Sequence, residues 1–198
     1  MKRIFCLFLL VTLMLFLLSG CDSDIAMLYT ESATVDHLRI EINKLQNCCF
    51  ASVYEYDGTE AGLQITIPDD CNGIPVVKLG GFIGSGAPSP FFIALSCYLN
   101  AEEGSEWYGV YHESLTADYP VENIVFSLHI GKNIKEMDFL NMDTYYPHVN
   151  EDGSILFYHP VVEVTCSEEN PYYYAEDGKL YEKTTDKLVD VFDYAADD

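Results

Sequence analysis

Hydrophobic and polar residues alternate along three stretches of the chain, with the period expected of a β-strand. In Leu63–Ile67 and Ile124–Ile130 every second residue is apolar, and the first of these runs stops at Pro68. Phe50–Tyr56 is a less regular run that ends at the turn pair Asp57-Gly58. Successive side chains of a strand point to opposite faces, so these runs predict half-buried strands.

One segment has a helical period instead. Apolar residues recur three and four positions apart at Val35, Leu38, Ile42 and Leu45. Thr34 stands where it can cap the first turn. This spacing predicts a short amphipathic helix over residues 35–46. The expected fold class is therefore mainly β with short helical turns.

The two alternating runs begin longer units that match each other. After Ile67 and Ile130 each unit turns and reaches a second group of apolar residues. The first unit has the longer turn, residues 69–75, and the second is one residue shorter before its last aromatic residue. The aligned pairs are Ile67 with Ile130, Val76 with Ile134, Leu79 with Met137 and Phe82 with Phe139. Repetition of a short strand–turn unit is typical of repeat architectures.

Residues 63–82, LQITIPDDCNGIPVVKLGGF, resemble the opening unit of the BspA-type leucine-rich repeats of bacterial surface proteins. Residues 164–183, VTCSEENPYYYAEDGKLYEK, resemble the same family's segment in which Asn-Pro-Tyr-Tyr leads through Asp-Gly to Leu-Tyr-x-Lys. The unit between them departs from the pattern at Gly131, where the family has Pro, and at Asp138, where it has Gly. The resemblance implies a small leucine-rich-repeat-like solenoid, although an array of so few units can also be globular. Asp177-Gly178 fits the two-residue turn of a hairpin.

Residues 84–119 match nothing in the repeat and form an insertion rich in aromatic residues. Insertions in repeat proteins form loops on one face, which is often the binding face. We therefore predict Trp107, Tyr108 and Tyr111 as partner-binding residues, because aromatic anchors with acidic neighbours are typical of interface centres. The alternative is that these aromatic side chains pack back on the repeat as a side core.

The N-terminus has the layout of a secretion signal. Two basic residues precede the apolar run Ile4–Leu18, which as a helix reaches about 22 Å and is shorter than a membrane-spanning segment. Leu18-Ser19-Gly20-Cys21 resembles the bacterial lipobox. The resemblance implies that residues 1–20 are a lipoprotein signal peptide and that Cys21 carries a diacylglyceryl anchor, which places the protein on the extracytoplasmic face of the cell membrane. An uncleaved single-pass anchor is the alternative.

Charge and cysteine content narrow the function further. Residues 1–21 hold two of the ten Lys+Arg and none of the 32 Asp+Glu, so the mature part has eight basic and 32 acidic residues, a net charge of −24. Such a surface repels phosphate backbones, which argues against a nucleic-acid partner. The mature part has five cysteines besides Cys21, so at least one is unpaired within the chain, and their pairing stays open. They are Cys48, Cys49, Cys71, Cys97 and Cys166.

Motifs for metal binding or catalysis are missing from the sequence. His148-x-Asn150-x-Asp152-Gly153 imitates part of a calcium loop, but His148 and His159 stand where acidic ligands belong, so we interpret it as a hairpin turn. The five histidines make no spaced metal pair, and there is no G-x-S-x-G. We expect no metal, no cofactor and no catalytic residue.

These features predict three parts: the signal peptide 1–20, a lipidated N-terminus and tether over 21–34, and a single domain over 35–198 that includes the insertion 84–119. The expected function is that of a lipid-anchored cell-surface protein that mediates protein binding or adhesion at the cell envelope, not an enzyme. One alternative is an envelope hydrolase with its site between the insertion and the repeat face. Another is an assembly role. Carboxylates converging with a histidine in a deep cleft would favour the hydrolase.

Overall fold

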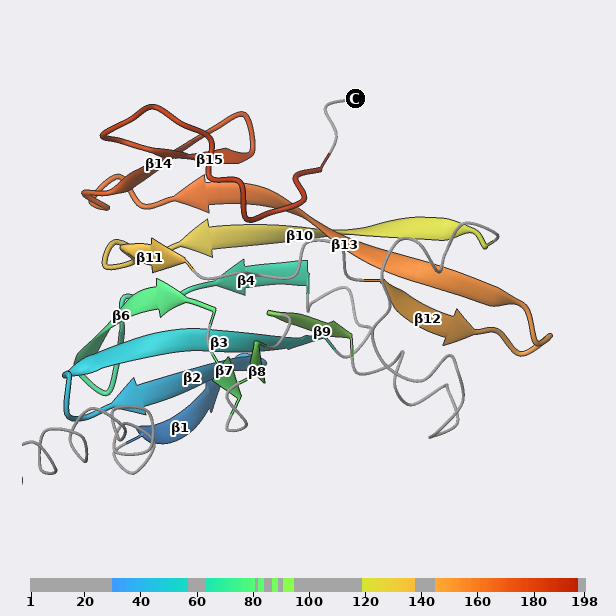
Figure 1. The fold of residues 1–198 in the computed structure, drawn as a ribbon, viewed down its shortest axis with the longest axis horizontal. Helices are drawn as coiled ribbons and strands as arrows, with labels where there is room; N and C mark the ends of the chain where they lie inside the picture. The colour runs from blue at the N-terminus through green and yellow to red at the C-terminus, as the bar shows by residue number, and fades with distance from the viewer. Residues whose placement is uncertain are drawn as a thin grey trace, which may run out of the picture.

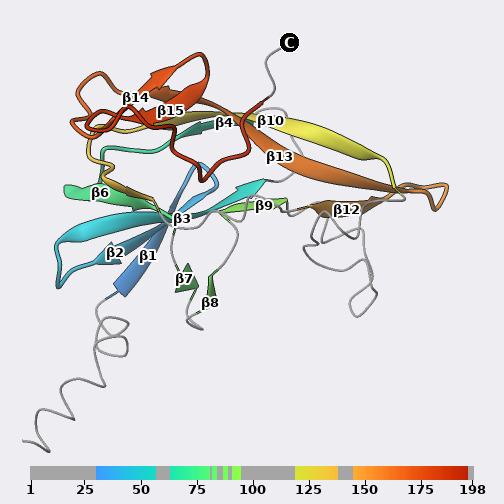
Figure 2. The ribbon, with the colours of Figure 1, turned by 45° about the horizontal axis from the view of Figure 1, so that its top comes forward.

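The computed structural model describes residues 30–56, 63–80, 82–83, 87–88, 91–94, 119–137 and 145–195. These residues form a mainly β fold in which two sheets curl around a shared core (Figures 1 and 2). The expectation of a mainly β chain is confirmed. No helix that is long and apolar enough to cross a membrane occurs in these ranges.

The first sheet begins with three antiparallel strands, β1 (Thr30–Val35), β2 (Leu38–Asn43) and β3 (Cys48–Tyr56). The helix expected over residues 35–46 is therefore wrong, because this segment contains the turn between β1 and β2 and all of β2. Leu38, Ile40 and Ile42 alternate along β2 and are all buried, whereas Leu45 is 64% exposed. Burial of every second residue decided the structure, and the helical spacing was coincidental.

Strand β1 begins at Thr30 and pairs with β2 along its whole length. The sheet thus starts inside the range 21–34 that we expected to form the tether. Residues 1–29, including the signal peptide and Cys21, lie outside the described residues.

Parallel strands continue this sheet. β6 (Ile74–Leu79) pairs parallel with β3, and β11 (Glu136–Met137) pairs parallel with β6. β5 (Asp70–Cys71) forms a short hairpin with the start of β6, and β9 (Phe92–Ala94) runs parallel to β3. A separate hairpin joins β7 (Phe82–Ile83) to β8 (Ala87–Pro88).

The second sheet is built on three parallel strands, β4 (Gln64–Thr66), β10 (Val121–Ile130) and β13 (Ile155–Cys166). β12 (Tyr146–Val149) adds an antiparallel strand to β13. The chain ends in the hairpin of β14 (Tyr173–Glu176) and β15 (Lys179–Glu182), followed by a segment that returns along β13, where Tyr194 bridges Val162.

The pairing register tests the alignment of the two units. His129 pairs with Thr66 and the N–H of Ile67 bonds the carbonyl of His129, so Ile67 and Ile130 occupy equivalent positions. Met137 pairs with Leu79, as the alignment requires. Leu128 pairs with both Ile65 and Val164, which brings the third unit into the same register. Phe139 lies outside the described residues.

The core lies between the two sheets. Ile65, Ile67, Ile130 and Val164 are each no more than 3% exposed, as the alternating pattern predicts. Tyr54 of β3 packs edge-on against Phe126 of β10, with ring centroids 6.0 Å apart, and so joins the sheets. The apolar faces of the two sheets therefore pack against each other.

The described cysteines, Cys48, Cys49, Cys71 and Cys166, are all free thiols. Burial raises the pKa of Cys49 to about 11, so this thiol is protonated and unreactive at neutral pH. Cys97 is not among the described residues.

Candidate binding surface

The polar side chains of β4, β10 and β13 form two rows across the parallel strands. Because paired residues of neighbouring strands project to the same face, each row is set by the register. The first row is Gln64, Ser127 and Glu163, and the second is Thr66, His129 and Thr165. Five of the six side chains are exposed and His129 is half-buried. We call these six residues the polar rows.

The two rows are ordered by contacts with each other and with the C-terminal hairpin. His129 Nδ1 lies 3.0 Å from Thr165 Oγ1, which fixes the imidazole in the plane of the second row. Gly178 in the turn of β14–β15 lies against Glu163, and its carbonyl accepts a hydrogen bond from the N–H of Val164. The rows offer hydroxyl, amide, imidazole and carboxylate groups to a partner.

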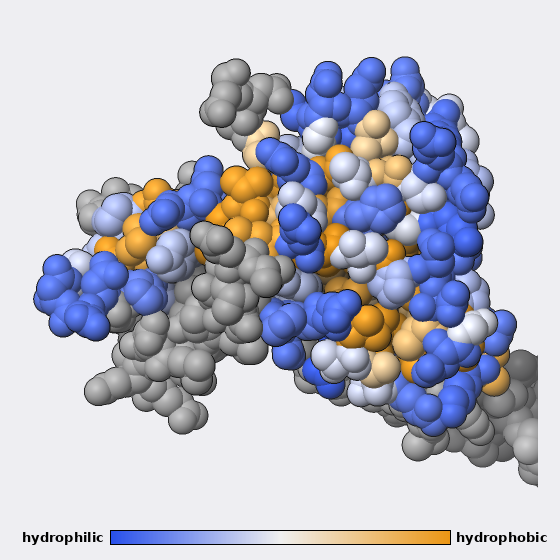
Figure 3. Space-filling model, turned by 180° about the vertical axis from the view of Figure 1, so that it is seen from behind, coloured by the Kyte–Doolittle hydropathy of each residue, from blue (hydrophilic) through white to orange (hydrophobic). Residues whose placement is uncertain are grey.

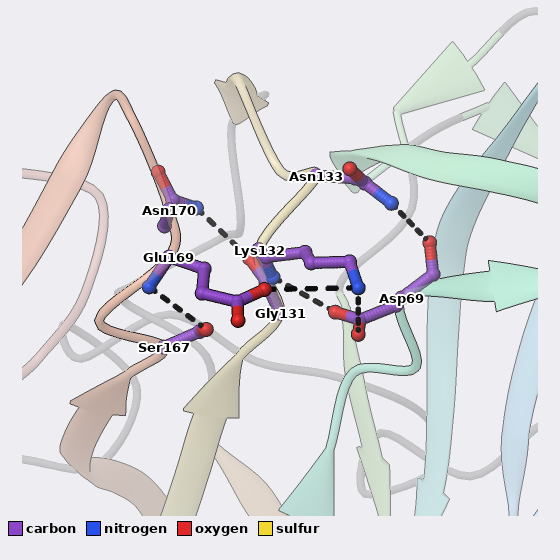
Figure 4. A network of polar contacts seen from close by, with 7 residues as sticks. All are labelled: Asp69, Gly131, Lys132, Asn133, Ser167, Glu169 and Asn170. Carbon is purple, nitrogen blue, oxygen red and sulfur yellow. Dashed lines mark hydrogen bonds and ion pairs between the residues drawn. The ribbon is translucent and has the colours of Figure 1, made fainter.

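One end of the rows is closed by a network of turns (Figure 4). Asp69, after β4, accepts a hydrogen bond from the backbone N–H of Lys132 at 2.9 Å, and its carboxylate lies 3.2 Å from Lys132 Nζ. Lys132 Nζ also lies 3.9 Å from Glu169, which follows β13. Figure 4 shows the Lys132 side chain extended between these two carboxylates. The backbone hydrogen bond from Lys132 lowers the pKa of Asp69, and the side-chain bond to Asp69 raises the pKa of Lys132.

Asn170 supports the same network from inside the protein. Its side chain is fully buried and donates to the carbonyls of Gly131 and Ile134, at 2.8 and 3.0 Å. Its Oδ1 accepts the N–H groups of Tyr172 and Tyr173. Asn170 therefore satisfies four backbone groups and joins the turn after β10 to the turn after β13.

Hydrophilic residues dominate the edge of the molecule on which these turns lie. This is the right-hand edge in Figure 3, which views the molecule from behind. Apolar residues are seen between hydrophilic ones in the middle of this view. The turn network thus forms a polar rim beside the sheets.

A second polar cluster involves His159 of β13. Its Nε2 lies 3.1 Å from Asp193 of the C-terminal segment, and Tyr145 stacks on the imidazole with ring centroids 4.5 Å apart. His159 is only 9% exposed. A carboxylate that orients a histidine is one component of a hydrolytic site, but this histidine is covered, and the contact holds the C-terminal segment against β13.

The residues predicted from the insertion lie mostly beyond the described ranges. Trp107, Tyr108 and Tyr111 are outside them, so their role stays a prediction. Phe91, immediately before β9, is fully buried, and Tyr119 packs on Phe157 with ring centroids 5.7 Å apart. The described ends of the insertion therefore join the core.

The calcium-like segment is a hairpin turn between β12 and β13. Asp152 accepts hydrogen bonds from the N–H and hydroxyl of Ser154, both 2 residues along the chain. These bonds lower the pKa of the Asp152 carboxyl. Within the described ranges, no group of three or more His, Cys, Asp or Glu side chains is placed to hold a metal ion.

Sequence reasoning located β3, β4, β10 and the C-terminal hairpin but missed the polar rows. The same alternation that predicts Ile65 and Leu128 as buried also predicts Gln64, Thr66, Ser127 and His129 as exposed. Only the parallel register shows that these residues lie side by side. The bonds from Asp69 to Lys132 span 63 residues of sequence and have no local signal. No family model, curated protein or solved structure matches the chain.

Proposed function

We propose that the chain is a lipid-anchored envelope protein whose small BspA-like repeat domain binds a protein partner across the polar rows. The observation that carries this proposal is the alignment of six polar side chains, five of them exposed and His129 half-buried, in two rows on three parallel strands. Exposed side chains on a shared sheet can contact one partner together, because the rigid backbone fixes their spacing. Their apolar neighbours are committed to the core.

The BspA-like assignment is supported by the way that the units stack. Strands β4, β10 and β13 pair in parallel at equivalent positions, and β6 and β11 do the same after their turns. Asn170, Tyr172 and Leu180, which belong to the family-like segment, contribute a buried amide, an exposed ring and a core side chain. The array would comprise three units, with the C-terminal hairpin beside the last of them.

The lipid anchor is supported by the lipobox-like segment that ends at Cys21. A Cys21→Ser variant, expressed with radiolabelled palmitate in a bacterial host, tests it. We expect the label in the wild-type protein and none in the variant. Label retained on the variant would refute lipidation at Cys21.

The binding function is tested by crosslinking the full-length protein in detergent micelles to envelope extracts and identifying what is captured. Replacing Ser127 and Glu163 by Arg and Lys should then reduce capture of that partner at least tenfold, because both changes add bulk and positive charge to the first row. Asp190→Lys, on an exposed residue of the C-terminal segment, adds two of the same three positive charges outside the rows and is the control for charge. Equal capture by both variants would exclude the rows as the contact surface.

A further inference from the structure

Among the described residues, strand β1 has an unpaired hydrogen-bonding edge, and the geometry of its turn shows which groups lie on it. Asp36 and His37 have φ values of 46° and 64° and form a two-residue connection of the type I′ class, between Val35 and Leu38. Residues that flank such a turn bond to each other, and bonding alternates along the hairpin. Val35, Ala33 and Glu31 therefore bond to β2, while the N–H and C=O groups of Ser32 and Thr34 point outward. In the described part of the chain, β1 ends the order of its sheet.

The other strand edges of the described fold are short or protected. Beyond its pairing with β12, the outer edge of β13 is covered by the C-terminal residues. Tyr194 bridges Val162, and the carbonyl of Gly178 accepts a hydrogen bond from the N–H of Val164. β12 contains Pro147, and β11 has only two residues. Natural sheets protect edges in these ways against pairing with other chains.

Within the part of the chain that the structure describes, strand β1 lacks such protection. It has six residues, no proline and no irregular pairing with β2. Its single charge, Glu31, is neutralised by Lys44, whose Nζ lies 2.5 Å away. On its core side, Ala33 packs against the core, and Val35 remains 39% exposed. An added strand with apolar residues at alternate positions would cover the exposed part of Val35 on this side of β1.

The net charge of the molecule indicates which kind of segment would pair with the edge of β1. The whole chain has a formal net charge of −22, so a second copy would be repelled at close approach, whereas a basic segment would be attracted. We propose that β1 accepts an extended, positively charged segment of a partner protein, which adds a strand to its free edge. This goes beyond the binding function proposed for the polar rows, which lie on the other sheet.

The test uses the full-length protein in detergent micelles and a fluorescent seven-residue peptide of alternating lysine and valine. Strand addition depends on main-chain groups, so Ser32→Pro, which removes an outward N–H, should weaken binding at least tenfold in fluorescence anisotropy. Ser32→Ala keeps that N–H and should bind like the wild type. A peptide with glutamate in place of lysine should bind at least tenfold more weakly, and added salt should reduce that difference.

A peptide N-methylated at alternate residues tests the same bonds on the wild-type protein, whatever the stability of the proline variant. We expect it to bind at least tenfold more weakly in the methylation register that blocks the bonds to β1. Undetectable binding of the lysine–valine peptide to the wild type, or equal binding to Ser32→Pro and Ser32→Ala, would overturn the proposal. So would a dimer in sedimentation that Ser32→Pro abolishes, because the edge would then belong to a second copy.

Discussion

Gly131 lies at the point where three segments of the turn network come closest. A Cβ at this residue would stand 2.8 Å from the carbonyl oxygen of Ile67 and 3.1 Å from the carboxylate of Asp69. Pro68 follows Ile67 at the equivalent place in the first unit, so the glycine after Ile130 has a local steric reason. The backbone of the neighbouring unit, not the turn itself, requires glycine here.

We predict that Gly131→Ala lowers the free energy of unfolding by roughly 1–3 kcal/mol, because the added methyl group must displace backbone atoms. Thermal melting followed by circular dichroism measures the effect. Ser127→Ala, on an exposed residue of the preceding strand, should change stability by less than about 0.5 kcal/mol. Equal melting temperatures for the two variants would show that the turn has room for a side chain.

Asp177 and Gly178 adopt φ values of 49° and 72°, which confirms the predicted hairpin turn between β14 and β15. Gly178→Val should cost about 1–2 kcal/mol of stability, because a β-branched residue is strained at positive φ. The nearest atoms to a Cβ here are 3.9 Å away, so backbone conformation and not crowding causes the loss. Glu176→Val on the adjoining strand is the control in the same melting experiment, and a loss of equal size there would contradict this explanation.

Asp69 should make stability depend on pH in the acid range. Its pKa in the folded protein is below the ordinary value of 3.8, so the folded state favours the ionised carboxyl. The stabilisation is therefore present above pH 3.8 and is lost as the pH falls through the lower folded pKa. Urea unfolding of wild type and Asp69→Asn should show a stability difference that shrinks as the pH is lowered from 6 to 2. A difference independent of pH would contradict the assignment.

At the scale of elements, contacts between turns hold the parallel strands in register. Asn170 is the clearest example, because one buried amide satisfies backbone groups in the turn before β11 and at the start of β14. A ladder of strand hydrogen bonds fixes which strands pair. The buried amide of Asn170 fixes the position of the turn after β13 relative to the turn after β10.

Asn170→Ala should lower the free energy of unfolding by more than about 2 kcal/mol, since it leaves several buried N–H and C=O groups unsatisfied. Asn150→Ala removes an exposed bond to Ser154 in the β12–β13 turn and should cost less than about 1 kcal/mol. Chemical denaturation of both variants compares them directly. Similar losses would mean that the Asn170 bonds are replaced by water.

At the scale of the whole molecule, the proposed contact regions are the insertion, the polar rows and the edge of β1. Its described ends join the core through Phe91 and Tyr119, while Trp107, Tyr108 and Tyr111 lie outside the described residues. The polar rows and the β1 edge belong to different sheets. Three separate contact regions can therefore be distinguished by mutation.

Changing Trp107 and Tyr111 together to Ala should weaken partner capture at least tenfold and leave the melting temperature within about 2 °C of the wild type, because surface changes are nearly neutral for stability. Capture in the crosslinking assay and melting are measured on the same preparation. Phe91→Ala, which empties a fully buried site, is the contrasting variant and should cost about 3–5 kcal/mol. Unfolding of the double variant would place both rings in the core.

Alternation in the sequence determined β4 and β10 and their buried faces, because a strand that lies on a core shows its pattern locally. The residues that match between units, such as Ile67 and Ile130, also predicted which positions pair. The same local reasoning failed over residues 35–46, where four apolar residues fit a helical period. Ile40 does not belong to that helical period, yet it is fully buried. Tertiary packing therefore overrode the helical pattern.

Only the tertiary structure decided what lies beside what. The polar rows require three strands that are distant in sequence to pair in parallel, and the Asp69–Lys132 contact requires two turns to meet. The free edge of β1 depends on the absence of a neighbour in the described sheet, which no local pattern encodes. Strand pattern is a local property of the chain, whereas register, edges and surfaces arise from contacts between distant segments.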